Sequence, residues 1–295
     1  MIGKTRHSPD LQKSPLASSL RQKTSQTCGD LIKLPSADWY RHTRIAPPPA
    51  LACWIEHFWL EAWEVSANAT QARELLPHPC VQLAFSPAGA RIYGVQQGRF
   101  VRTYQGEGRV FGVKFRAGAF FPFLRRPVSS ISNTSIAAAR VFPTAGTLAA
   151  QIFGCGTSEG MVATAAQFLL THLPPLDPQV NFTGRVVEAI VNDREMRRVQ
   201  QLLPRFGTTE RRLQRLFHRY VGASPRWVIK RYRAYEALDH LNDPQPLPLA
   251  AVAQDLGYFD QAHFANDFKS VTGQAPSEFA ECVLRLKANL RPDPG

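Results

Sequence analysis

The chain has 295 residues and a formal charge of +12, and its five cysteines are odd in number and widely spaced. This length leaves room for two domains with separate cores, and the basic balance favours a polyanionic partner. No apolar run approaches the about 20 residues needed to cross a bilayer, which argues against a membrane protein. Without a C-x-x-C pair, the cysteines favour free thiols in a reduced, cytoplasmic protein.

Residues 1–44 are rich in Ser, Thr, Gln and Lys, and this composition predicts a disordered tail. The segment begins with basic residues but has no apolar core, so a secretory signal is not expected.

A β-rich domain is predicted for residues 45–173. Four short segments separated by Gly and Pro are typical of strands in a small barrel or sandwich, namely residues 81–85, 91–95, 99–104 and 109–115. Residues 158–172 place apolar side chains on one helical stripe, so a helix is expected after the sheet. A Pro-rich stretch over residues 174–180 then predicts an interdomain linker.

The front domain offers weak candidates for a metal site. His57 and His78 are the histidines considered, with Glu56, Glu61 and Glu74 nearby, but no His-x-His motif occurs in the domain. Two isolated histidines are more often structural, so no metal and no cofactor are expected.

The other reactive or aromatic side chains of the front domain also favour structural roles. Cys80 is expected to be a small buried residue and not a nucleophile. Trp54, Phe58 and Trp59 are expected to pack in a core or between domains, with a ligand pocket as the less favoured alternative. No catalytic residue is identified, and the chain is not expected to be an enzyme.

A helix with one cationic face is predicted over residues 209–220. Its apolar stripe is spaced i, i+3, i+4, i+7 and consists of Leu213, Leu216, Phe217 and Tyr220. A second face carries Arg211, Gln214, Arg215 and His218. Thr208 or Thr209 can cap the helix, and Gly207 suits a tight turn after a scaffold helix that ends near Phe206. Pro204 is expected to shorten or bend that scaffold helix.

Basic residues are dense around this helix. Twelve Arg and Lys lie between Arg194 and Arg233, opposed within that stretch only by Glu195 and Glu210. A charge of this size would repel itself unless a polyanion neutralised it, which favours nucleic acid over a merely solvated helix face.

A second pair of helices follows a connecting helix predicted over residues 225–242. Eighteen residues at about 1.5 Å each span about 27 Å, which is compatible with about one turn of DNA. A short scaffold helix from Pro248 to Gly257 precedes a helix over residues 260–271, capped by Asp260. Another short helix is expected from Pro276 through Phe279.

Over about residues 185–282 the chain resembles the AraC/XylS family of transcription regulators. The resemblance rests on two clusters of residues. The C-terminal cluster is Gly257-Tyr258, Phe264, Phe268-Lys269, Gly273, Pro276-Ser277 and Phe279, and the earlier one is Leu213 to Phe217 with Gly222. It implies an α+β protein whose DNA-binding domain, residues 181–285, holds two helix-turn-helix units, with a tail at 286–295. A sequence-specific regulator reading two successive major grooves is therefore expected.

The resemblance also implies which side chains meet DNA. The base contacts would be Arg211, Gln214 and Arg215 in the first helix, and Ala262, His263 and Asn266 in the second. The phosphate contacts would be Arg212, His218, Arg219, Gln261 and Lys269. For His263 a phosphate contact is an equal alternative. Arg matches guanine, and Gln or Asn matches adenine, in the major groove.

The front domain resembles the cupin-like sensor domain often fused ahead of such DNA-binding domains. The residues that carry this are 54–59, 76–80 and 112–118. The resemblance implies promoter DNA and RNA polymerase as partners, a small-molecule or protein effector at the front domain, a nucleoid-associated location, and a homodimer as one oligomeric option.

Two other classes remain open. An alkylation-repair protein can carry a similar DNA-binding module, but it needs a four-cysteine zinc cluster that is absent from this sequence. A nonspecific nucleoid protein would bind all duplexes uniformly through phosphates.

Overall fold

The structure, a computed structural model, describes residues 38–243 and 247–289. Residues 1–37 of the predicted disordered tail, including Cys28, lie outside the described residues. The last part of that prediction is wrong, because strand β1 (Tyr40–Ile45) pairs antiparallel with β2 (Ile55–Glu64). The strand was missed because the prediction used the average composition of residues 1–44, in which its few apolar residues carry little weight. Tyr40 is buried beside the ring of Tyr104, with ring centroids 5.5 Å apart.

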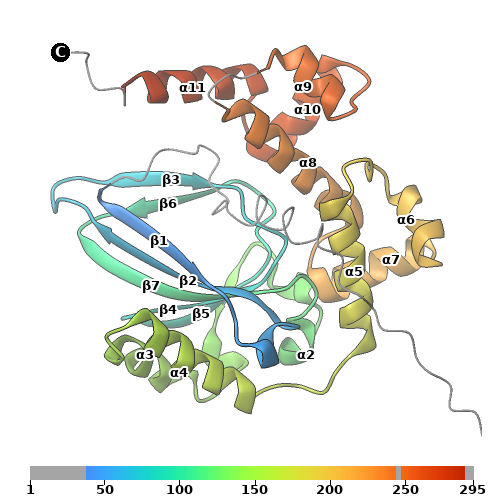
Figure 1. The fold of residues 1–295 in the computed structure, drawn as a ribbon. Helices are drawn as coiled ribbons and strands as arrows, with labels where there is room; N and C mark the ends of the chain where they lie inside the picture. The colour runs from blue at the N-terminus through green and yellow to red at the C-terminus, as the bar shows by residue number, and fades with distance from the viewer. Residues whose placement is uncertain (1–37, 244–246, 290–295) are drawn as a thin grey trace, which may run out of the picture.

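The described residues contain two antiparallel sheets (Figure 1). The remaining strands are β3 (Gln71–Leu75), β4 (Gln82–Ser86), β5 (Gly89–Tyr93), β6 (Phe100–Tyr104), β7 (Glu107–Phe115) and β8 (Ser135–Ala137). The larger sheet has the order β1–β2–β7–β4–β5–β8, and β3 with β6 forms a two-stranded ribbon. Two sheets that are not hydrogen-bonded to each other correspond to the sandwich alternative and not to a closed barrel.

The β-rich front half and the helical C-terminal half confirm the α+β prediction. The four predicted strands correspond to β4, β5, β6 and β7, with ends shifted by one or two residues. The prediction missed β1, β2, β3 and β8. In β2 both faces are largely buried, so its sequence lacks the clear alternation that marks a half-exposed strand.

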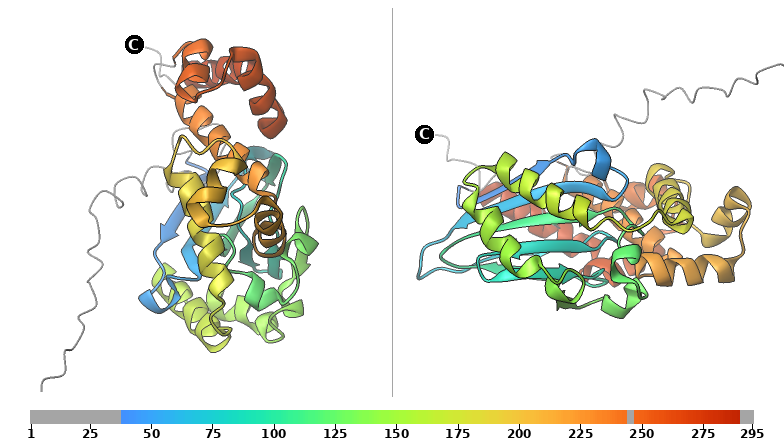
Figure 2. Two further views of the ribbon diagram at one scale, coloured as in Figure 1. Left: turned by 90° about the vertical axis from the view of Figure 1, so that its right-hand side faces the viewer. Right: turned by 90° about the horizontal axis from the view of Figure 1, so that it is seen from below.

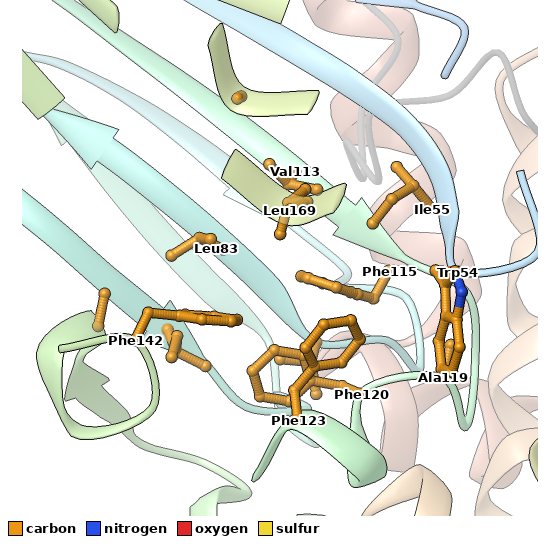
Figure 3. Close-up of a cluster of buried hydrophobic side chains, with 14 of the residues drawn as sticks. Trp54, Ile55, Leu83, Val113, Phe115, Ala119, Phe120, Phe123, Phe142 and Leu169 are labelled. Carbon is orange, nitrogen blue, oxygen red and sulfur yellow. The ribbon is translucent and has the colours of Figure 1, made fainter. Parts of the chain in front are cut away.

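One face of the larger sheet forms the main core of the front domain. Leu83, Phe85, Phe111 and Val113 are fully buried there. They pack beneath α2 (Phe121–Leu124), α3 (Ala145–Gly154) and α4 (Ser158–Thr171), and α3 and α4 lie across this face (Figure 2, right). The predicted helix over residues 158–172 is therefore confirmed. Aromatic rings close the end of this core, including Phe115 and Phe120 at 4.7 Å between centroids (Figure 3).

Short helical turns link these elements: η1 (Pro49–Leu51), η2 (Val128–Ile131) and η3 (Ala138–Arg140). The C-terminal half then consists of α5 (Pro178–Asn192), α6 (Val199–Phe206), α7 (Glu210–Leu216), the π-helical turn η4 (Phe217–Val221), α8 (Pro225–Leu241), α9 (Leu249–Asp255), α10 (Gln261–Thr272) and α11 (Pro276–Asn289). Helix α8 leads from the α5–α7 group to the α9–α11 group (Figure 1).

Two helix ends differ from the predictions. Helix α5 begins at Pro178, inside the expected linker, because Asp177 accepts a hydrogen bond from the amide of Gln179 at 2.8 Å and caps the helix. Helix α11 continues past Phe279 to Asn289, since Val283 is buried in the same core one turn further on. The predicted tail at 286–295 therefore begins later, and residues 290–295 lie outside the described residues.

The two halves share their cores along a seam. Leu76 of the front domain is buried among α8, α9 and α10, and Val95 is buried among α5, α6 and α7. The hydroxyl of Tyr235 donates to the carbonyl of Leu76, and the guanidinium of Arg231 donates to the carbonyl of Gln97 at 2.5 Å. The front domain therefore packs directly on the helix that joins the two helical groups.

Candidate nucleic-acid interface

The first helix-turn-helix unit consists of α6, a turn at Gly207 and α7. Gly207 has a φ of 54°, in the left-handed region where glycine carries no steric penalty. Thr209 caps α7 by accepting the amide of Arg212 at 3.3 Å, which resolves the choice between Thr208 and Thr209. Helix α6 is eight residues long and contains Pro204 in its last turn, in agreement with the expected shortening.

The predicted faces of α7 are confirmed by burial. Leu213 and Phe217 are fully buried, whereas Arg211, Gln214 and Arg215 are exposed together on the opposite side. The Gln214 amide donates to the carboxylate of Glu210 at 3.2 Å. The helix thus presents two guanidinium groups and one amide outward, while its apolar stripe holds it in the core.

The end of this helix differs from the continuous α-helix predicted over residues 209–220. Residues Phe217–Val221 form the π-helical turn η4, closed by a hydrogen bond from the amide of Gly222 to the carbonyl of Phe217 at 2.8 Å. Here His218 hydrogen-bonds with Ser129 at 3.2 Å. The guanidinium of Arg219 lies 4.5 Å from the ring centre of Phe121. These two predicted phosphate contacts therefore touch the front domain, although both remain exposed.

The second unit consists of α9, a turn at Gly257 and α10. Asp260 caps α10, as predicted, and accepts the amide of His263 at 2.7 Å. Phe264, Phe268 and Val271 are buried. The exposed side holds Gln261, Ala262, His263, Asn266 and Lys269. The site residues predicted for this helix thus lie on its solvent side.

Phe259, which the sequence analysis did not single out, is 95% exposed immediately before α10. An aromatic ring so exposed beside the predicted reading face is a further candidate contact for DNA. The turn signal at Gly257-Tyr258 would have placed it at the helix start, but no pattern in the sequence indicated that its ring faces solvent.

Much of the basic density has partners within the fold, which corrects the charge argument from the sequence. Arg231 and Arg233 are buried, and Arg233 donates to Glu236 at 2.7 Å. Lys230 pairs with Asp267 at 2.6 Å. Similarly, Arg205 pairs with Asp193 at 2.9 Å and Arg197 with Glu195 at 3.1 Å. Asp193 and Glu236 lie just outside the stretch in which charges were counted, and Asp267 lies 37 residues from Lys230, so a count over the stretch alone overstated its free charge.

A cavity of about 280 Å³ lies in the front domain between the second face of the larger sheet and the β3–β6 ribbon. Trp59 lines it, in agreement with the less favoured alternative of a pocket; Trp54 and Phe58 are in the core as expected. His57 and His78 also line the cavity. Burial, together with the nearby Lys114, lowers the pKa of His57 to about 3, so its imidazole is neutral at pH 7.

Cys80 is buried beside this cavity, and burial raises the pKa of its thiol to about 12. The thiol is therefore protonated and a poor nucleophile at neutral pH, in line with its expected structural role. Cys53, Cys80, Cys155 and Cys282, the cysteines within the described residues, form no disulfide. Within residues 38–243 and 247–289 there is no cluster of three or more His, Cys, Asp or Glu side chains suited to a metal ion.

The comparisons with known proteins agree with this geometry. Residues 189–281 match a family model described as a helix-turn-helix domain, and residues 43–137 match a domain of unknown function (DUF6597). A probable AraC family transcriptional regulator from Rhodopseudomonas palustris is 30% identical, covering 35% of this chain and 97% of that chain, with a TM-score of 0.31. A search among curated proteins finds no match.

Two further solved structures are more distant. ToxT from Vibrio cholerae is 10% identical over 84% of this chain and 99% of that chain, with a TM-score of 0.37. The C-terminal domain of AraT, a response regulator from Geobacillus stearothermophilus, is 21% identical over 37% of this chain and 88% of that chain, with a TM-score of 0.32.

Two helix-turn-helix units joined by one helix, beside a β-rich domain, define a DNA-binding transcription regulator. The assignment to a family rests on the matched helix-turn-helix domain and on the 30% identity over nearly the whole Rhodopseudomonas chain. It does not rest on the TM-scores of the structural comparisons. The chain belongs to the AraC family. Among the helices within the described residues, none combines the length and apolar character needed to cross a membrane.

Proposed function

We propose that this regulator recognises a specific duplex sequence through the outer faces of α7 and α10. The observation that supports this proposal most directly is which basic side chains around α7 are paired and which are not. Arg211 and Arg215 are exposed without an acidic partner among the described residues, while Arg233 and Lys230 are ion-paired. Guanidinium groups on the solvent side of a groove-sized helix match the O6 and N7 acceptors of guanine.

Helix α8 sets the separation of the two reading helices. Its 17 residues span about 26 Å at about 1.5 Å each, which is of the order of one DNA turn of about 34 Å. The exposed face of α10 offers His263 and Asn266 but no arginine, so the first unit contributes more of the affinity, while each unit carries one amide side chain that matches adenine.

The test compares Arg215→Ala with the matched variant Arg212→Ala, whose guanidinium lies 5.6 Å from the ring centre of Phe182 at the side of the helix. A binding site is first selected from a random duplex pool. Loss of a base contact costs about 1–3 kcal/mol on that site and relaxes one position, while loss of a phosphate contact weakens all duplexes alike. Equal loss for Arg215→Ala on selected and random DNA would reject base reading and favour the nonspecific nucleoid alternative.

The front domain regulates this DNA binding in the same proposal. The carbonyl of Gly222, at the end of the first reading helix, accepts hydrogen bonds from Ser132 at 2.6 Å and from Gln97 at 3.3 Å, both in the front domain. Ser132→Ala removes the shorter bond and is expected to change affinity for the selected site without changing the preferred sequence. If Ser132→Ala changed neither the affinity for the selected site nor transcription from it, the proposed control of DNA binding by the front domain would be rejected.

RNA polymerase contact, a homodimer and the absence of enzymatic activity complete the proposal. Transcription from a template carrying the selected site, with purified polymerase, tests the first. Molar mass in solution, with and without that site, tests the second. Zinc analysis of the purified protein tests the alkylation-repair alternative, which requires stoichiometric metal.

A further inference from the structure

We propose that the front-domain cavity binds a small organic anion with an apolar body, whose acid group is held by Arg44 and Trp59. The proposal rests on the regulatory role proposed above for the front domain, because it names the chemical class of the effector. The ligand-binding part of the proposal stands on the cavity alone and can be tested without DNA.

The two faces of the larger sheet differ in chemistry because side chains alternate along each strand. In β4, Leu83 and Phe85 are buried in the core, while Gln82 and Ala84 point to the opposite face and line the cavity. The cavity lining contains four Arg or Lys side chains and one glutamate: Arg44, Arg91, Arg102, Lys114 and Glu61. A cavity with this excess of positive charge favours an anion.

Three of these four cations already have partners. Arg102 pairs with Glu61 at 2.7 Å, and Arg91 donates to the hydroxyl of Ser135 at 2.9 Å. Lys114 pairs with Glu56 at 2.9 Å. Arg44 is different, because its Nε and Nη1 atoms are buried and find no acceptor among the described residues.

A second unpartnered donor lies beside Arg44. The Nε1 atom of Trp59 is buried and also has no acceptor within the described part of the chain. Arg44 and Trp59 are direct cross-strand partners in β1 and β2, so their side chains project from the same face as neighbours. The indole is held against Gly112, where a Cβ atom would lie only 2.0 Å from the ring.

Buried donors without an acceptor are costly, and a ligand that supplies the acceptor relieves this cost on binding. An acid group offers several acceptor oxygens, and it offsets the charge of Arg44 as well as satisfying Trp59. A neutral amide offers one oxygen and no charge. The donor pair therefore selects an acid over its neutral analogue.

The rest of the cavity fits an apolar body of limited size. Leu75, Phe100 and Val110 contribute apolar walls. The volume of about 280 Å³ lies just below the range for ligand pockets, about 300–1,000 Å³. A small molecule with an aromatic or short aliphatic body matches this space, and a macromolecular segment does not.

The cavity wall also contacts the helix that joins the two DNA-reading units. His78 lines the cavity and stacks on Tyr235 of α8, with ring centroids 4.4 Å apart. Gln96 lines it as well, and the next carbonyl, that of Gln97, accepts the hydrogen bond from Arg231 of α8. A ligand that fills the cavity therefore acts on α8 through two adjacent wall segments.

Binding is measured by titration calorimetry on the full chain with three probes that share one body: 4-phenylbutyrate, 3-phenylpropyl phosphate and 4-phenylbutyramide. One or both acids are expected to bind about tenfold or more tightly than the amide, because only they pair with the guanidinium. Preference between the two acids identifies the carboxylate or the phosphate monoester as the natural acid group.

Arg44→Gln is expected to lose about tenfold or more in affinity for the acid and to keep its weak binding of the amide. Arg41→Gln is the matched control, since Arg41 is exposed on the same strand and projects from the other face. Trp59→Phe keeps an aromatic ring at this position and removes the Nε1 donor, which provides an independent test should Arg44→Gln unfold. Acid binding that is absent, equal to amide binding, or unchanged in both variants overturns the proposed site.

The link to DNA is measured separately, as affinity for the selected duplex with and without the better acid. A change of affinity in wild type that is lost in Arg44→Gln supports regulation through this cavity. Acid binding without any change of DNA affinity leaves the site intact and overturns its regulatory role. Failure to bind any duplex selectively would instead reject the proposed base reading.

Discussion

Replacing Gly257 with alanine tests how the turn of the second helix-turn-helix unit is built. Gly257 has a φ of 68°, and a Cβ atom there would lie 1.4 Å from the Nη1 atom of Arg197. That same Nη1 atom donates to the carbonyl of Gly257 at 3.0 Å. An alanine at this position therefore strains the backbone and expels the guanidinium that bridges the two helix-turn-helix units.

The two effects can be estimated separately. A left-handed conformation costs a non-glycine residue about 1–2 kcal/mol. The hydrogen bond from a charged donor contributes about 1.5–3 kcal/mol, and the lower value applies because the Arg197 side chain is 31% exposed and water can replace its partner. Gly257→Ala is thus expected to destabilise the protein by about 2.5–3.5 kcal/mol.

Gly207→Ala is the matched control. Gly207 also has a positive φ, 54°, but no atom lies within 4 Å of a Cβ atom placed there. Only the backbone effect applies, so the expected loss is about 1–2 kcal/mol. Urea unfolding followed by far-ultraviolet circular dichroism gives both values, provided that the slope with urea is unchanged.

Equal losses at Gly257 and Gly207 would refute the reasoning, because the contact with Arg197 would then contribute nothing. A double-mutant cycle sharpens the test: Arg197→Ala should destabilise the wild type but have almost no further effect in Gly257→Ala, where the contact is already broken.

Three further predictions concern capping, phosphate contacts and pH. Asp260→Ala removes the cap of α10 and should cost about 1 kcal/mol in urea unfolding, whereas Asp260→Asn should retain most of it; equal loss in both would reject the capping role. Lys269→Ala should lower the slope of log affinity against log salt by about one, while Lys230→Ala, whose ammonium is paired with Asp267, should leave that slope unchanged; equal slopes for both variants would contradict the assignment. Burial lowers the pKa of His57 from 6.5 to about 3, so stability is fully present above pH 6.5 and falls by up to about 1.4 kcal/mol per pH unit as pH drops towards 3; a urea midpoint that is the same at pH 7.5 and pH 5, or a pH dependence unchanged in His57→Gln, would exclude this contribution.

Local patterns were informative wherever one face of an element is buried. The i, i+4 spacing of Leu213 and Phe217 was sufficient to predict which side of α7 is exposed, because burial in a helix repeats every 3.6 residues. The cap at Asp260 could be predicted for a similar reason, and the cap of α7 could be narrowed to Thr208 or Thr209, since a cap satisfies an amide only three residues away. Contacts with DNA bases stay a prediction at every residue named for them.

Patterns failed where both faces are covered or where a partner lies far along the chain. Strand β2 was missed because its two faces are both largely buried. The partners of Arg231 and Tyr235 lie 134 and 159 residues away along the chain, at Gln97 and Leu76, and no periodicity encodes such a pair. The same limit applied to Trp59, whose sequence neighbours predict burial but not the cavity on which its indole borders.

The amino-acid sequence by itself determined the two helix-turn-helix units, the outward cationic face of the first and the β-rich character of the front half. These features depend on the spacing of neighbouring residues, which a sequence states directly. Only the tertiary structure decided that Lys230 of α8 pairs with Asp267 of α10, how the front domain packs on α8, and where two buried donors remain without an acceptor. Such features arise when separate segments meet, 37 residues apart for Lys230 and Asp267 and 159 residues apart for Leu76 and Tyr235, so charge and burial at those points depend on the fold.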